Sequence, residues 1–200
     1  MNTVRESWRR IEQWLRSEAP DLSKHLPPPV NDVALEELTQ KLGLSLPEDL
    51  RESYLVHNGA DYGPREISLF PPQLASEMDL AFCLLPIKNI SKERRIWIEL
   101  LERGELDTHT TSPDPEIGPG WWRPGWVPVA GNGAGDFICI DLSPGPGGSE
   151  GQVILSWHDR KERKLLAPSW ACYLDNVATA MEDGSIRFDP DYGLVTASRS

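Results

Sequence analysis

Cysteine is scarce in this chain of 200 residues, which contains only Cys83, Cys139 and Cys172. They lie far apart and never form the C-x-x-C spacing of a zinc or redox motif, which excludes that class of site. Their odd number and the apolar neighbours of Cys139 and Cys172 indicate buried free thiols in a reducing compartment.

Long hydrophobic runs are also missing. No apolar run approaches the roughly 20 residues that a helix needs to cross a membrane. The N-terminal stretch from Met1 to Trp8 lacks the apolar segment of a secretory signal peptide. We therefore expect a cytoplasmic protein with no membrane partner.

Basic residues are fewer than acidic ones. The chain has 20 Lys and Arg and 31 Asp and Glu, which gives a formal net charge of −11. Such a charge repels a phosphate backbone, so we expect no nucleic-acid partner. It suits a basic protein partner, such as a nuclease or a deaminase that itself binds nucleic acid. A second interpretation stays open, in which the acidity only keeps a cytosolic protein in solution.

Catalytic motifs are absent as well, since the chain has neither a G-x-S-x-G elbow nor an H-E-x-x-H pair. The glycines of 131–135 precede an apolar run rather than a helix, so they indicate a turn and not a dinucleotide site. Asp141 ends a predicted strand and can accept hydrogen bonds from the following turn, which disfavours a metal cluster with Asp136 and Glu150. We expect no cofactor and no metal. A small hydrolase built on Cys139 and His158–Asp159 stays open as a third interpretation.

The hydrophobic periodicity predicts an α+β fold in a single domain spanning 1–200. Helices come first, strands occupy the middle and a helix closes the chain. Three apolar runs joined by Gly-rich turns predict a central, mainly antiparallel sheet, with the N-terminal helices and the C-terminal helix packed against it. Helices are predicted over 4–18, 32–42, 91–103 and 169–183, with Ser169 as N-cap of the last, and strands over 67–70, 82–86, 126–130, 137–142 and 151–157.

Four local predictions concern a helix start, a helix end, a strand and a link. Ser45 with Glu48 three residues later has the spacing of a capping box, and Asn58–Gly59 suits the positive-φ end of the helix between them. Pro128 predicts that its strand lies at the sheet edge or contains a bulge. Pro20 and the prolines of 27–29 predict an extended link after the first helix.

Several segments resemble a known family. They are Ser45-Leu-Pro-Glu-Asp-Leu-Arg-Glu-Ser-Tyr-Leu-Val-His-Asn-Gly59, Gly125-Trp-Val-Pro-Val-Ala-Gly-Asn-Gly-Ala-Gly-Asp136, the strand Phe137–Leu142, Gly148-Ser-Glu-Gly-Gln-Val-Ile154 and Ala167-Pro-Ser-Trp170. In this order they resemble the SMI/KNR-like family of the SUKH superfamily, which comprises bacterial immunity proteins and yeast cell-wall assembly regulators. The resemblance implies a protein-binding domain without chemistry of its own.

The resemblance leads us to predict an immunity protein that neutralises a cognate bacterial toxin such as a nuclease or deaminase. The alternative is a regulatory scaffold of the cell-wall assembly type.

Trp121–Trp122 is the candidate anchor for the partner. Adjacent residues on an extended segment point to opposite faces, so one of the pair is expected at the surface, where Trp is common in interface hot spots. Asp114, Glu116 and Asp136 lie nearby in sequence and are expected to supply an acidic rim. The opposing interpretation, in which both tryptophans tuck under the Pro-rich loop of 104–120, carries equal weight.

Overall fold

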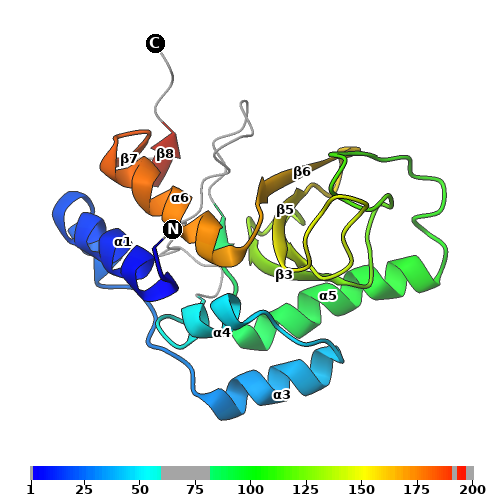
Figure 1. Cartoon of the computed structure of the whole chain (residues 1–200), viewed down its shortest axis with the longest axis horizontal. Coiled ribbons are helices and arrows are strands. Elements are labelled where there is room, and N and C mark those ends of the chain that lie inside the picture. The colour runs from blue at the N-terminus through cyan, green and yellow to red at the C-terminus, as the bar shows by residue number, and fades with distance from the viewer. Residues whose placement is uncertain (1, 60–81, 191–192, 197–200) are drawn as a thin grey trace.

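A six-stranded sheet forms the centre of the molecule in the computed structural model, which describes residues 2–59, 82–190 and 193–196. The strand order is β1-β3-β4-β5-β6-β2, with β7 and β8 paired in a separate two-stranded sheet (Figure 1). The helices are α1 Val4–Glu18, α2 Pro20–Ser23, α3 Asp32–Leu42, α4 Glu48–Tyr54, α5 Ile87–Glu102 and α6 Trp170–Glu182. The strands are β1 Cys83–Leu84, β2 Ser112–Pro113, β3 Trp126–Gly131, β4 Phe137–Asp141, β5 Gln152–Ser156, β6 Glu162–Ala167, β7 Ile186–Asp189 and β8 Gly193–Thr196.

The predicted α+β class and the antiparallel meander β3-β4-β5 are confirmed. Among the strands that the structure describes, only β2 runs parallel to its neighbour, β6. The register shifts between Pro128 and Ala130, so the predicted bulge is present, and β3 is not an edge strand because β1 pairs with its other side. Every residue of β3, β4 and β5 is buried, which requires cover on both faces of the sheet.

Helices supply that cover. α5 lies against β3, while α6 packs on β5 and β6 and in turn carries α1 on its outer side (Figure 1). The apolar stripe of α1 is buried, with Trp8, Ile11 and Leu15 at most 1% exposed. The C-terminal helix α6 therefore packs against the sheet as predicted, whereas α1 packs on α6. None of the described helices is long and apolar enough to cross a membrane.

The helix boundaries follow the sequence with two exceptions. α1 and α3 have the predicted bounds, and Ser169 caps α6 by accepting a hydrogen bond from the Cys172 amide at 3.2 Å. The capping box at Ser45 is wrong, since α4 begins at Glu48 with Pro47 as its N-cap residue. A residue before proline is disfavoured in the helical region, so Leu46 cannot open a helix and Ser45 stands too early to cap one.

The second exception is α5, which begins at Ile87 rather than at Ser91. Pro86, the residue before the helix, offers no side-chain cap, and the cap comes from far along the chain: the Asn58 side chain accepts a hydrogen bond from the Ile87 amide at 3.1 Å. A cap from another element leaves no local mark in the sequence, so the first turn of α5 was not predicted.

Some elements were not predicted at all. The extended link predicted at Pro20 is wrong, because Pro20 is the first residue of the short helix α2. Proline is favoured at this first helical position. The strands β2, β6, β7 and β8 also escaped prediction. The predicted strand over 67–70 lies outside the described residues.

Candidate protein-binding surface

The residues that carry the family resemblance near Gly59 join elements together rather than form a site. Tyr54 donates a hydrogen bond from its hydroxyl to the Leu85 carbonyl at 2.9 Å. Asn58 caps α5, and Gly59 packs against the backbone next to β1, where a Cβ atom would lie 2.0 Å from the Leu85 carbonyl carbon. The predicted positive φ at Asn58–Gly59 is wrong, because α4 ends at Tyr54 and neither residue adopts one. This motif stabilises the contact of α4 with β1 and α5.

Asp114, the first of the predicted rim residues, is engaged by β6. Its carboxylate accepts hydrogen bonds from the Leu165 amide at 2.9 Å and from the Lys164 ammonium at 3.0 Å. Its own amide donates to the Arg163 carbonyl at 2.9 Å. Glu116 holds the same loop through its backbone carbonyl, which accepts from Gln152 and the Gly145 amide. Asp114 therefore fixes the loop to the sheet edge, while the half-buried Glu116 side chain makes no hydrogen bond or ion pair with the described residues.

The tryptophan pair divides between two environments. Trp122 is 2% exposed and stacks on Trp97 of α5 with ring centroids 5.1 Å apart. Trp121 is half-buried, and its ring lies under the guanidinium of Arg163 at 4.8 Å and beside His109 at 4.5 Å. The two rings face opposite sides, as the extended backbone predicts, and only Trp121 keeps part of its surface accessible.

Arg163 holds this region together, and no sequence pattern predicted that role. It is fully buried, and its guanidinium donates to the carbonyls of Arg160, Glu162 and Trp121 at 2.6–2.8 Å. Burial lowers its pKa to about 10. A charged residue inside a short polar segment is normally exposed, so only the fold could show that this one is buried.

Asp136 lies in the turn before β4 and is 4% exposed. One carboxylate oxygen accepts from both the amide and Nδ1 of His158, at 2.8 and 2.9 Å, and the other accepts from Asn132 at 2.7 Å. Asp136, His158 and Asp159 could each offer one ligand atom to a cation, and these atoms lie within 4.8 Å of one another. Both oxygens of Asp136 already accept hydrogen bonds, one from Asn132 in its own turn and one from His158 after β5, so Asp136 joins these two loops.

The Cys139–His158–Asp159 arrangement of the hydrolase interpretation does not form. Cys139 pairs with Ile154 across the sheet, four positions before His158 and so about 13 Å from it along the strand. The thiol is fully buried, and burial raises its pKa well above the ordinary value. Asp141 likewise has a structural role: it accepts from the Ser143 amide at 2.9 Å and from Gln152 at 3.0 Å, and burial raises its pKa.

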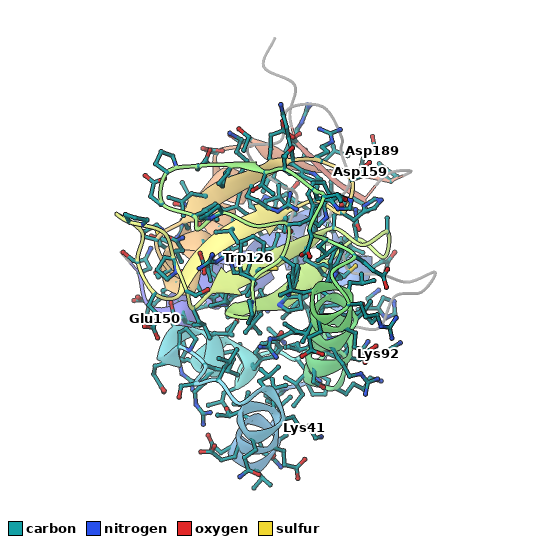
Figure 2. The ribbon with its side chains drawn as sticks, turned by 90° about the vertical axis from the view of Figure 1, so that its right-hand side faces the viewer. Lys41, Lys92, Trp126, Glu150, Asp159 and Asp189 are labelled. Carbon is teal, nitrogen blue, oxygen red and sulfur yellow. The ribbon has the colours of Figure 1, made fainter. Side chains whose placement is uncertain are left out.

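A second group of residues was missed because it joins two helices. In Figure 2, Lys41 at the end of α3 lies at the bottom and Lys92 on α5 lies above it on the right, on the side opposite to Glu150. With Arg94 and Arg95 they line one hollow. The sequence signal was present, since these three residues of α5 stand within four positions, but their meeting with Lys41 follows only from the packing of α3 on α5.

Comparison with known proteins identifies similar chains. The chain is 32% identical over 94% of its length to the Schizosaccharomyces pombe "Cell wall biosynthesis/cell cycle regulator smi1". It is 28% identical over 94% of its length to a Neurospora crassa "Glucan synthesis regulatory protein", and 23% identical over 90% to the Saccharomyces cerevisiae "Cell wall assembly regulator SMI1". It spans 38% to 40% of the length of these three relatives.

These relatives correct the functional prediction. Their names describe fungal regulators of the cell wall, of glucan synthesis and of the cell cycle, so the predicted bacterial immunity protein and its cognate toxin are wrong, and the findings favour the regulatory alternative. The family itself is confirmed by a sequence profile of the SMI1 / KNR4 family (SUKH-1) that matches residues 29–176. Residues 29–176 include α3 to α5, the meander and the first half of α6, and by that match the chain belongs to the SMI1/KNR4 family.

Proposed function

We propose that this chain is the protein-binding domain of a regulator of cell-wall assembly and has no catalytic activity. The observation that carries the proposal is the match along 94% of the chain to a relative named as a cell-wall biosynthesis regulator. The chain aligns with about two fifths of the length of these longer regulators. That share is what we expect of a binding domain that serves the activity of a larger protein. We also propose that the domain spans 1–200 and works in the cytoplasm.

The chemistry of the described residues supports a binding role. The Cys139 thiol is buried with a raised pKa, and the His158 ring is held by Asp136. Nucleophilic catalysis needs a thiolate within hydrogen-bond reach of a base, and this pair lacks that geometry. We infer that binding to another protein, and not turnover of a substrate, is what this domain contributes.

One face for that contact is the surface beside β6. Of the five residues that the sequence suggested, Trp122 and Asp136 are buried and Asp114 is engaged by Lys164 and β6, which leaves Glu116 and Trp121 as the contact residues. Trp121 is held in place by Arg163, so its exposed edge is preorganised. A rigid aromatic edge beside a carboxylate suits a partner with a basic, partly apolar surface.

The proposal is tested by exchange of this chain for the matching segment of the Schizosaccharomyces pombe regulator. We expect the chimera to restore growth of the segment-deletion strain in the presence of a cell-wall-digesting glucanase. Chimeras with Cys139→Ala or His158→Ala should restore growth equally, whereas Glu116→Lys combined with Trp121→Ala should not. Glu150→Lys, at an exposed turn, is the matched control.

Chimera abundance is followed in each strain, so that loss of folding is separated from loss of function. Failure of the His158→Ala chimera at normal abundance would contradict a purely binding role. Growth of the Glu116/Trp121 variant like the parent chimera would remove this face from the proposal.

A further inference from the structure

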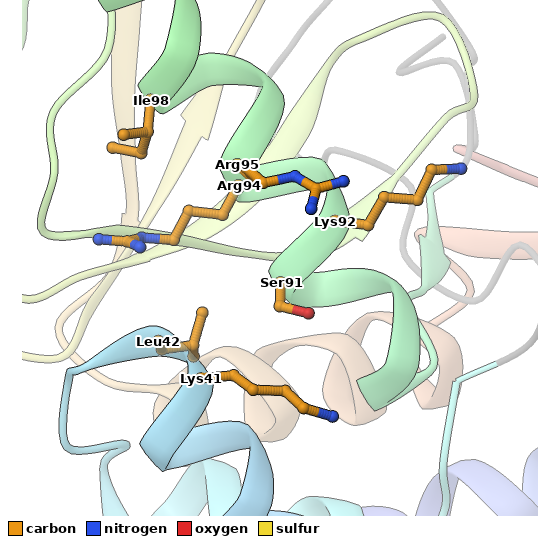
Figure 3. A pocket seen from close by; sticks show the side chains of 7 residues that line it. All are labelled: Lys41, Leu42, Ser91, Lys92, Arg94, Arg95 and Ile98. Carbon is orange, nitrogen blue, oxygen red and sulfur yellow. The ribbon is translucent and has the colours of Figure 1, made fainter. Parts of the chain in front are cut away.

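A hollow of about 370 Å³ lies between the end of α3 and the middle of α5. Figure 3 shows Leu42 of α3 pointing toward Ser91 of α5, while the side chain of Lys41 extends sideways below them. Of the seven lining residues four are cationic and none is acidic; the cationic ones are Lys41, Lys92, Arg94 and Arg95. This concentration of positive charge stands out in a chain whose net charge is −11.

The charges of α5 are arranged against the stability of the helix. Its first turn contains Lys88 and no acidic residue, and its last turn contains Glu99 and Glu102 and no basic residue. The helix dipole favours the opposite order, with acids at the N-terminal end and bases at the C-terminal end. This dipole effect is confined to the first and last turns, so it gives no reason for Lys92, Arg94 and Arg95 in the middle of α5, and binding of an anion would give one.

The cations have few partners within the described part of the chain. Within the described part of the chain, neither Lys41 nor Lys92 forms an ion pair. Arg95 lies 3.6 Å from Glu99, in a pair whose side chains are 71% and 48% exposed. Arg94 donates to the Pro124 carbonyl, and its buried Nε has no acceptor among the described residues. An anion in the hollow would be attracted by the positive charge of the residues that line it.

We propose that this hollow binds a phosphate group carried on a serine of a partner protein, with an apolar residue beside it. Arginine offers the planar fork that suits phosphate, and the two lysines add point charges. The Ser91 hydroxyl adds a donor, and Leu42 and Ile98 provide an apolar surface for the neighbouring residue of the peptide. Clusters of basic side chains are a recurring means of phosphopeptide recognition.

A peptide suits the hollow better than other phosphate carriers. The negative charge of the rest of the molecule would repel a nucleic acid or an anionic membrane, both of which extend well beyond 370 Å³. The inference deepens the proposed function, because it names a surface and a chemistry for one protein contact.

The test is a binding measurement with the purified full chain. Amide shifts are recorded by NMR during titration with O-phosphoserine, and affinity is measured by fluorescence anisotropy for a degenerate peptide pool with one fixed central phosphoserine. The unphosphorylated pool is the ligand control. Lys92→Glu with Arg95→Glu is the test variant, and Arg9→Glu with Lys161→Glu, both exposed and outside the hollow, is the control with the same charge change.

We expect saturable shifts at the amides of Lys41–Gly43 and Ser91–Ile98, and affinity for the phosphorylated pool at least tenfold above that for the unphosphorylated pool. The test variant should lose this preference, whereas the control variant keeps it. Equal loss in both variants, absence of saturable shifts, or tighter binding of phosphoinositide vesicles or single-stranded RNA would each overturn the proposal. These results do not depend on the growth of the chimera, so the two proposals can fail separately.

Discussion

Gly59 passes so close to the backbone next to β1 that no side chain fits between them. A Cβ atom there would lie 2.0–2.2 Å from the backbone of Leu84 and Leu85, far inside van der Waals contact. Backbone cannot move aside as the end of a flexible side chain can, and the same segment is fixed by Tyr54 and Asn58. The need for glycine at this position is steric and has no connection with a left-handed conformation.

We therefore expect Gly59→Ala to lower the free energy of unfolding by about 3 kcal/mol, at the upper end of overpacking costs. Gly184→Ala is the control, because Gly184 has φ +79° and nothing within 4 Å of an added Cβ, so only the left-handed strain of about 1 kcal/mol applies. Urea unfolding followed by tryptophan fluorescence measures both. Equal losses would show that the segment next to β1 yields to the methyl group.

At the scale of elements, α1 is fixed to α6 by one arginine. Arg10 on α1 donates to Asp175 at 2.6 Å, to Thr179 at 3.0 Å and to Glu182 at 2.5 and 2.9 Å, all on α6. The Asn2 hydrogen bond and Arg10 together lower the pKa of Asp175, and Arg10 lowers that of Glu182. Both carboxylates are thus more easily ionised in the folded protein than in the unfolded chain.

A lowered folded-state pKa of an acid adds stability that is complete above the unfolded pKa and disappears as the pH falls through the folded one. We expect Arg10→Met to cost about 1 kcal/mol at pH 7, a modest value because these side chains are partly exposed. The cost should shrink as the pH falls below the ordinary pKa values of 4.5 and 3.8.

Urea unfolding between pH 3 and pH 8 measures this difference. Arg16→Met, which loses only an exposed pair with Glu12 on the same helix, is the control and should cost less than about 0.5 kcal/mol. A cost of Arg10→Met that stays constant down to pH 3 would show that the arginine acts through packing and not through its charge.

Over the molecule as a whole, the elements predicted correctly are those with a regular hydrophobic period. The apolar runs of β3, β4 and β5 and the stripes of α1, α3 and α6 were found because each has a clear period and clear ends. β6 was missed because it buries Arg163 among other polar residues, and β2 because two residues carry no pattern. Which tryptophan of the pair is buried could not be predicted, because burial of Trp122 depends on Trp97, far away in sequence.

The partner could not be predicted from the family motif. Tyr54, Asn58 and Gly59 hold α4, β1 and α5 together, and a motif made of such contacts identifies the scaffold whatever the scaffold binds. Residues that select a partner lie on the surface, where the sequence pattern constrains them least. The immunity prediction failed at this point, although the family and the fold class were correct.

We expect the folding unit to be larger than the segment that matches the family profile. The family match covers residues 29–176, but the packing extends further at both ends. Trp8 is fully buried and donates to Ser53 at 2.8 Å, Ile11 and Leu15 are buried beside it, and Met181 of α6 is 1% exposed. Each such side chain contributes roughly 1.5–3 kcal/mol on burial. Their joint loss is comparable with the total stability of about 5–15 kcal/mol that domains possess.

We therefore expect a fragment of residues 29–176 to lack cooperative unfolding in differential scanning calorimetry, whereas a fragment of residues 2–196 unfolds like the full chain. A fragment of residues 2–176 separates the two ends, because it restores α1 but leaves α6 without its second half, including Met181. It should fold with a lowered Tm, since the surface on which α1 packs is incomplete. A cooperative transition of the 29–176 fragment at the Tm of the full chain would mean that the first helix and the end of α6 are additions to a smaller, independent domain.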